Sequence, residues 1–361
     1  MKRERIVAGI TNGDINGIGY EIIIKGLMDN RINDICTPVV YGSPKVAAYH
    51  RKALNIGNFS FNNIRSPGEA NHKRANLINC LSDDIRVELG KSTRDGGEGA
   101  YRSLEAAVND LKDGNIDLIV TAPIDKQSIQ SDTFTFPGHT EYLQQSFGVD
   151  EVLMLMISEN MKIGTVTGHI PLSEVPGALS KELVINKIRV MGAALVNDFI
   201  VRRPRIAVLG LNPHAGDNDL LGTEERDVIT PAVEQARSEG ILAFGPYAAD
   251  GFFGSGQFLK FDGILAMYHD QGLAPFKALA FDSGVNYTAG LPVVRTSPAH
   301  GTAFGIAGAG QASPEGFRQA LYVACEIFRN REINAGITEN PLEGQQADKM
   351  CGDSDELPLA E

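Results

Sequence analysis

Three of the seven histidines each follow a short apolar segment and fall in a polar turn: His169, His214 and His269. If those segments are parallel strands, the imidazoles project from the carboxyl ends of the strands, where ligands bind in such folds. Neutral imidazoles that converge there would bind a borderline divalent metal and leave positions open for substrate. The spacing alone does not exclude three separate structural histidines, because about fifty residues separate each from the next.

Two carboxylates neighbour this histidine set. Asp270 directly follows His269, and Asp250 ends the segment 246–250. A carboxylate beside a metal-bound alcohol could accept its proton or orient a ligand imidazole. Asp250 has an equally simple alternative role as the N-cap of a helix that starts at residue 251.

A second group of side chains is suited to binding an anion. Lys277, Asn286 and Arg295 lie close together in the sequence, and His139 and Thr140 lie in the turn 136–141. Lysine and arginine can hold phosphate or carboxylate, and arginine does so with two parallel hydrogen bonds. Each taken singly would more often be a solvated surface charge. Segment 286–308 is rich in Gly, Thr, Ser and Pro, which predicts a backbone that approaches a ligand closely.

Two glycine-rich segments fall short of nucleotide-binding motifs. Residues 12–21 follow the first apolar segment, but Ile22 stands where a Rossmann fingerprint needs its third glycine, and no Walker A lysine motif is present. Residues 95–99 predict a flexible turn before a helix. A dinucleotide would therefore bind by some means other than a Rossmann domain.

Strand-like and helical segments alternate along the chain. This alternation predicts an α/β fold with a largely parallel sheet. The predicted strands are residues 6–10, 37–41, 118–121, 152–157, 162–166, 205–211 and 263–267, and the predicted helices are 99–113, 181–199, 224–239 and 314–329.

Length and composition restrict the class of protein. The 361 residues suggest about two domains, and a net charge of −12 argues against general nucleic-acid binding. No apolar stretch is long enough to predict a membrane span or a signal peptide. The four scattered cysteines, Cys36, Cys80, Cys325 and Cys351, suggest reduced thiols in a cytoplasmic protein.

Several of these strings, in this order, resemble the 4-hydroxythreonine-4-phosphate dehydrogenase family over roughly residues 6–330. Segments 211–216 and 266–272 are long and unusual, so chance is a poor explanation. The matching stretches are 13–21, 121–126, 138–143, 169–176, 211–225, 266–272 and 284–308.

The resemblance implies two α/β/α domains with mostly parallel sheets and a cleft between them, similar to isocitrate and isopropylmalate dehydrogenases. The first domain, on the cofactor side, would combine residues 1–133 and 300–340. The second, residues 134–299, would carry the metal site and the interface of a homodimer. Residues 341–361 would form a disordered acidic tail.

The resemblance also assigns roles to residues. It implies a divalent metal (Zn, Mg or Co) at His169, His214 and His269, with one imidazole contributed by the partner subunit. NAD would lie along loops of the cleft, with its contact residues left open. The resemblance further implies substrate binding by His139, Thr140, Lys277, Asn286 and Arg295, and catalytic roles for Asp250, Asp270 and Lys277.

The activity implied is oxidation of 4-phosphohydroxy-L-threonine at C3 with decarboxylation, in pyridoxal 5'-phosphate synthesis. Related phosphorylated acids, 4-phospho-D-threonate and 4-phospho-D-erythronate, remain alternatives. So do a phosphate acyltransferase of similar architecture and a non-catalytic anion-binding protein. Ile15 and Tyr20 stand where the family motif usually has proline, which could alter loop shape or substrate choice.

Overall fold

The computed structural model describes residues 5–280 and 283–339, and every structural statement below concerns those residues. The predicted acidic tail and Cys351 lie outside them. Cys36, Cys80 and Cys325 are free thiols. None of the helices in the described ranges combines the length and apolarity needed to cross a bilayer.

The strands of the described chain form one continuous sheet. They are β1 (Val7–Thr11), β2 (Thr37–Gly42), β3 (Asn62–Ile64), β4 (Asn76–Asn79), β5 (Leu118–Thr121), β6 (Leu153–Ser158), β7 (Met161–Thr165), β8 (Arg205–Leu209), β9 (Leu242–Tyr247), β10 (Gly263–Ala266), β11 (Val285–Ala289) and β12 (Val294–Pro298). Their order is β3-β4-β2-β1-β5-β12-β11-β6-β7-β10-β8-β9. Antiparallel pairing is confined to the centre, where β11 pairs with β12 and β6, and β6 pairs with β7. The predicted α/β class with a mostly parallel sheet is confirmed.

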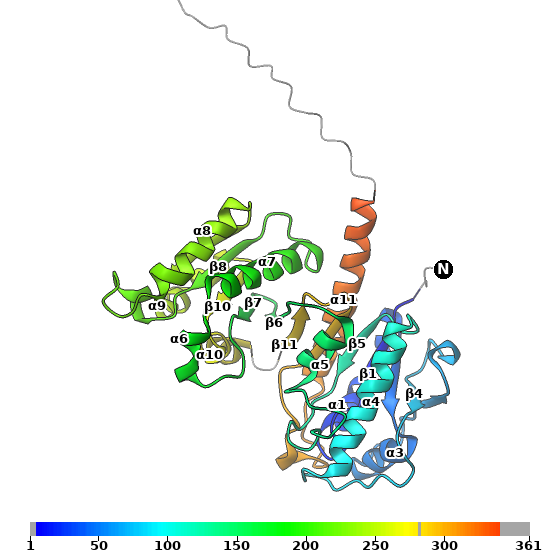
Figure 1. The fold of residues 1–361 in the computed structure, drawn as a ribbon. Coiled ribbons are helices and arrows are strands. Elements are labelled where there is room, and N and C mark those ends of the chain that lie inside the picture. Colours follow the sequence, from blue (N-terminus) through cyan, green and yellow to red (C-terminus); the bar gives the residue numbers. More distant parts are fainter. Residues whose placement is uncertain (1–4, 281–282, 340–361) are drawn as a thin grey trace, which may run out of the picture.

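Helices gather around this sheet in two lobes, one around β1–β5 and one around β7–β10 (Figure 1). The helices are α1 (Gly19–Leu27), α2 (Ile32–Ile35), α3 (Pro44–Ala53), α4 (Arg94–Lys112), α5 (His139–Phe147), α6 (Val175–Ala178), α7 (Lys181–Asn197), α8 (Thr230–Ser238), α9 (Ala249–Gly254), α10 (His269–Ala280) and α11 (Glu315–Thr338). The two lobes share one continuous sheet, whereas the prediction was a separate sheet in each domain. The exact domain boundaries stay a prediction.

Segment 95–99 is not a turn, as its glycines had suggested, but part of the first turns of α4. The hydroxyl of Thr93 accepts a hydrogen bond from the amide of Gly96, which caps the helix. A Cβ on Gly97 would lie 1.8 Å from the carbonyl oxygen of Ser128. The glycine therefore allows α4 to approach the turn after β5.

The motif of residues 11–20 is buried throughout and makes a packed turn. The Tyr20 hydroxyl accepts a hydrogen bond from the Ser43 amide at 2.8 Å, at the start of α3. Its ring stacks on His50 at 5.1 Å between centroids, and His50 Nε2 donates to the Ile15 carbonyl at 2.7 Å. Both residues that depart from the family motif thus interact with His50 in the core. Burial lowers the pKa of His50 to about 4.

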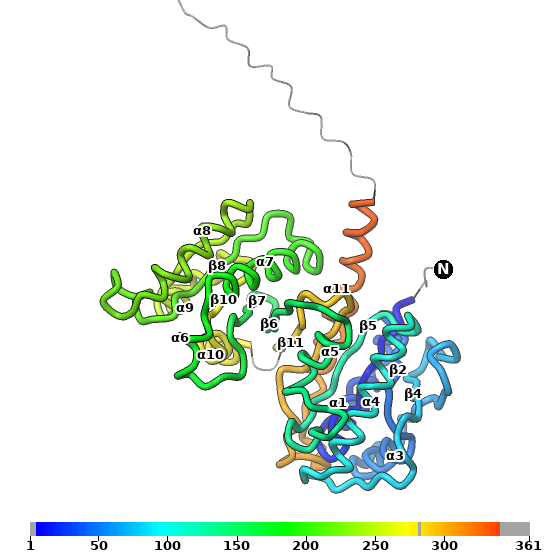
Figure 2. Tube along the Cα trace, in the orientation of Figure 1, coloured from blue at the N-terminus to red at the C-terminus, as the bar shows by residue number. Residues whose placement is uncertain are grey.

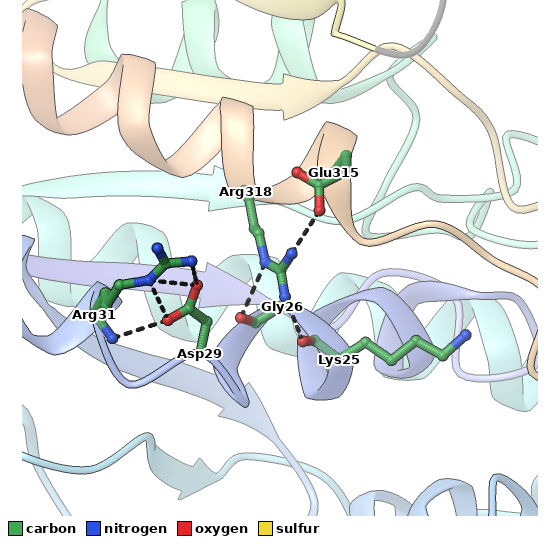
Figure 3. Close-up of polar contacts among 6 residues, drawn as sticks. All are labelled: Lys25, Gly26, Asp29, Arg31, Glu315 and Arg318. Carbon is green, nitrogen blue, oxygen red and sulfur yellow. Dashed lines mark hydrogen bonds and ion pairs between the residues drawn. The ribbon is translucent and has the colours of Figure 1, made fainter.

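Helix α11 links the two lobes, and Figure 2 shows it between them. Near its start, Arg318 donates to the carbonyls of Lys25 and Gly26 at 3.1 and 3.4 Å, which satisfies the last turn of α1 (Figure 3). Farther along, Arg331 forms an ion pair of 2.6 Å with Asp198 at the end of α7. The helix is therefore held at both lobes.

Candidate active site

The three predicted metal ligands follow strands that lie side by side. Strand β10 pairs in parallel with both β7 and β8, so the carboxyl ends of all three strands share one edge of the sheet. His169 lies beyond β7, His214 beyond β8, and His269 begins α10 directly after β10. This common edge is what the sequence predicted.

Two of the three imidazoles come together. The rings of His169 and His269 lie 5.3 Å apart between centroids. His214 is exposed, in a turn where its φ is +53°. Over the described part of the chain, no three His, Cys, Asp or Glu residues are grouped closely enough to hold a metal ion. One chain therefore presents a pair of imidazoles, which fits a metal site that needs a further ligand.

The surroundings of the two imidazoles suit metal binding. His269 Nδ1 lies 2.7 Å from Asp270 Oδ1, an arrangement in which the carboxylate fixes the ring and leaves Nε2 free. Burial, followed by the charges of Lys126 and His269, lowers the pKa of His169. A neutral imidazole is the form that binds metals.

Arg295 lies on β12 and is 3% exposed, in contrast to the surface position usual for arginine. Its Nε and Nη2 donate to the Thr121 hydroxyl at 3.1 and 2.7 Å, and its Nη1 donates to Thr288 at 3.2 Å. Burial lowers its pKa to about 10, and the charge of Glu141 opposes that shift. The guanidinium is charged at neutral pH, and it forms no ion pair within 4 Å with any carboxylate of the described residues. Because an uncompensated buried charge is costly, this position suits an anionic ligand.

Two predicted substrate residues leave polar atoms unpartnered near Arg295. His139, the first residue of α5, has a buried Nε2 with no hydrogen-bond partner, and so does Oδ1 of Asn286. Asn286 pairs with Ser297, which lies two residues beyond Arg295 on the same face of β12. Burial, and then the charges of Arg295 and Lys126, hold the pKa of His139 well below its usual range. Thr140 follows in the same helical turn.

Lys126 lies between these two groups and was not among the predicted site residues. It stands in the turn after β5, and its Nζ lies 3.5 Å from His169 Nε2. Its Cε would be 3.9 Å from a Cβ on Gly138, beside His139. The sequence signal for Lys126 as a site residue is its position just after the carboxyl end of a predicted parallel strand. A lone lysine is normally interpreted as a surface charge, and Lys126 is in fact exposed.

Two other predicted residues form no hydrogen bond or ion pair with this group. Lys277 on α10 is exposed and makes no polar side-chain contact with another described residue. Asp250 is exposed in the first turn of α9, where the N-cap is Ala248 without a side-chain hydrogen bond. The N-cap alternative for Asp250 is therefore wrong. A hollow of about 820 Å³ beside the start of α4 contains none of the predicted residues.

Comparisons with known proteins agree on one family. The family described as pyridoxal phosphate biosynthetic protein PdxA matches residues 34–324. A 4-hydroxythreonine-4-phosphate dehydrogenase of Bacteroides thetaiotaomicron is 53% identical over 99% of this chain and 98% of its own. A candidate D-threonate 4-phosphate dehydrogenase of Oceanobacillus iheyensis is 38% identical over 91% of this chain and 99% of its own. The crystal structure of 4-hydroxythreonine-4-phosphate dehydrogenase from Klebsiella pneumoniae superposes with a TM-score of 0.79, at 34% identity, over 90% of this chain and 100% of that one.

Proposed function

This chain belongs to the PdxA family of pyridoxal phosphate biosynthetic proteins, and on that premise we propose its reaction. It oxidises 4-phosphohydroxy-L-threonine at C3, with NAD as the hydride acceptor and a bound divalent metal. Loss of carbon dioxide from the resulting β-keto acid gives 3-amino-2-oxopropyl phosphate. The Bacteroides relative is named for this substrate.

The buried guanidinium of Arg295 is the single observation that best supports this proposal. It lies near the unpartnered Nε2 of His139 and Oδ1 of Asn286, so the cluster offers a positive charge together with unused hydrogen-bonding capacity. A substrate phosphate or carboxylate would neutralise the guanidinium and accept from His139 Nε2, whereas Oδ1 of Asn286 would accept from a substrate hydroxyl or amino group. Charge-assisted hydrogen bonds of this type contribute about 1.5–3 kcal/mol each.

The metal would be held by His169 and His269 of one chain together with His214. When bound, such an ion polarises the substrate hydroxyl and lowers its pKa. Asp270 keeps the His269 imidazole oriented through its 2.7 Å contact with Nδ1. His139, neutral at physiological pH, donates a hydrogen bond from Nε2 to the anion without adding charge.

We further propose that the active enzyme is a cytoplasmic homodimer with shared sites. Large apolar side chains are exposed next to several candidate residues. Ile170 and Leu172 follow His169, Leu220 and Leu221 follow His214, and Leu279 follows Lys277, with exposures from 38% to 78%. A second copy that covers them would bring Lys277 and Asp250 to a site from which one chain alone keeps them apart. The free thiols are in keeping with the cytoplasm.

A second substrate is favoured by one specific observation. The Oceanobacillus relative, at 38% identity, is named for D-threonate 4-phosphate, which carries a hydroxyl in place of the amino group. None of the relatives reported above is named as an acyltransferase, so we do not carry that alternative forward.

The deciding experiment is a substrate panel. The purified protein is incubated with 4-phosphohydroxy-L-threonine, 4-phospho-D-threonate and 4-phospho-D-erythronate, with NAD or NADP and several divalent ions, and NADH or NADPH is measured by absorbance. We expect the highest kcat/KM with the amino acid, NAD and a divalent ion. A higher value with a hydroxy acid would reassign the substrate, and no coenzyme reduction with any of them would refute the dehydrogenase.

A further inference from the structure

Lys126 occupies a position that the proposed chemistry has not used. Its Nζ donates to His169 Nε2 at 3.5 Å, and its charge contributes to the low pKa of both His169 and His139. It therefore lies between the imidazole pair and the anion-binding cluster. It makes no ion pair with a carboxylate of the described chain.

The contact with His169 cannot persist in a metal-loaded site. Lysine can only donate hydrogen bonds, so His169 must accept through the lone pair on Nε2. That lone pair is the one an imidazole gives to a metal when Nε2 is the ligand atom. The ammonium, which forms no ion pair with a described carboxylate, is then available to an anionic oxygen next to the metal.

We propose that Lys126 binds an anionic oxygen of the substrate, phosphate or carboxylate, beside the metal. The inference rests on the proposed function, because it assigns one more ligand to the same substrate. Lys126 then complements Arg295: the arginine is buried and held by two hydroxyls, whereas the lysine is exposed on a loop and free to turn from His169 to the incoming anion.

A structural role for Lys126 makes the opposite prediction for metal affinity. If the lysine served to hold His169 in place, its removal would weaken metal binding. If it is an anion ligand, its removal takes away a positive charge that repels the metal, and metal binding becomes tighter. The sign of the change therefore separates the two roles.

The experiment compares Lys126→Met and Lys126→Arg with the parent protein. Lys91→Met serves as a matched control, because Lys91 is an exposed lysine of the same lobe, paired with Glu88 at 2.9 Å. KM and kcat are measured with 4-phosphohydroxy-L-threonine and with its phosphate-free analogue. Zinc affinity is measured by calorimetry without substrate.

For Lys126→Met we expect a rise in KM of about tenfold or more, equal to about 1.4 kcal/mol, and a gain in zinc affinity. Lys126→Arg should keep most of the substrate affinity, and Lys91→Met should match the parent. A loss confined to the phosphorylated substrate assigns the contact to phosphate, and an equal loss with both compounds assigns it to carboxylate.

An unchanged KM, or weaker zinc binding in Lys126→Met, overturns the proposal. If the parent itself does not reduce NAD with this substrate, the proposed function fails instead. The zinc comparison then still decides whether Lys126 supports His169 or repels the metal.

Discussion

Replacement of Arg295 by methionine tests whether its charge binds the substrate or stabilises the fold. The guanidinium is 3% exposed and bonded only to the hydroxyls of Thr121 and Thr288 among the described residues. Methionine is shorter but close in volume and uncharged, so the space is largely filled while the anion ligand is removed. Arg295→Lys keeps the charge but loses the two-pronged geometry.

The expected magnitudes follow from these contacts. Loss of a two-bond, charge-assisted contact of about 3 kcal/mol raises the KM for the phosphorylated substrate about a hundredfold, since 1.4 kcal/mol is a factor of ten. Arg295→Lys should raise it about tenfold. Stability changes little, because the lost hydrogen bonds to hydroxyls are offset by relief of a desolvation cost of several kcal/mol.

The assay measures NADH formation for KM and urea unfolding for stability. Arg189→Met is a suitable control, because Arg189 is an exposed arginine on α7 paired with Glu239. If Arg295→Met unfolded much more easily while the substrate KM stayed the same, the residue would be structural. If the KM for NAD rose instead, Arg295 would serve the cofactor, and its assignment to the substrate would be wrong.

Three further outcomes are expected. A mixture of inactive His169→Ala and inactive His214→Ala chains should recover up to about a quarter of parental activity through hybrid dimers, whereas His169→Ala with His269→Ala should stay inactive, since those two rings share one chain. Gly97→Ala should lose at least about 2 kcal/mol in urea unfolding, because its Cβ would meet a backbone oxygen at 1.8 Å. Because burial lowers the pKa of His50 from 6.5 to about 4, the unfolded chain takes up the proton first as pH falls. The free energy of unfolding should therefore decrease by about 3 kcal/mol between pH 6.5 and about 4.

A specific result would contradict each of these three predictions. Recovery of activity by the His169 and His269 variants together, after confirmed subunit exchange, would place those ligands in different subunits. Gly336→Ala, where nothing lies within 4 Å of the added Cβ, should be neutral or stabilising, and an equal loss there would remove the packing argument for Gly97. A pH dependence that is unchanged in His50→Gln would assign the acid sensitivity to other groups.

The common edge of the histidines could be predicted because it depends on local patterns. Apolar segments followed by polar turns mark parallel strands, and ligands gather at their carboxyl ends. Which strands are neighbours is not local information, so the approach of His169 to His269 but not to His214 appears only in the folded chain.

Strands β11 and β12 were missed for a related reason. The Gly, Thr, Ser and Pro content of segment 286–308 predicted a backbone that approaches a ligand, yet the segment contains β12 and all but the first residue of β11, and Thr288 and Thr296 are buried at the centre of the sheet. Val285, Tyr287 and Thr288 favour strands individually, but two short runs separated by Gly290 and Pro292 carry too weak a pattern to stand out. Tertiary context explains Arg295, whose burial a sequence pattern would not predict, and Lys126, whose role depends on the side chains that its loop faces.

The pairing of β5 with β12 also has a consequence for biosynthesis. Strand β5 is translated early, yet its partner Val294–Pro298 and the helix α11 that packs on both emerge from the ribosome only near the end of the chain. Until then the nascent first lobe carries an open, apolar strand edge of the kind that recruits other chains. The first lobe is thus completed only by segment 294–338, so the open edge of β5 persists while about 170 further residues are synthesised.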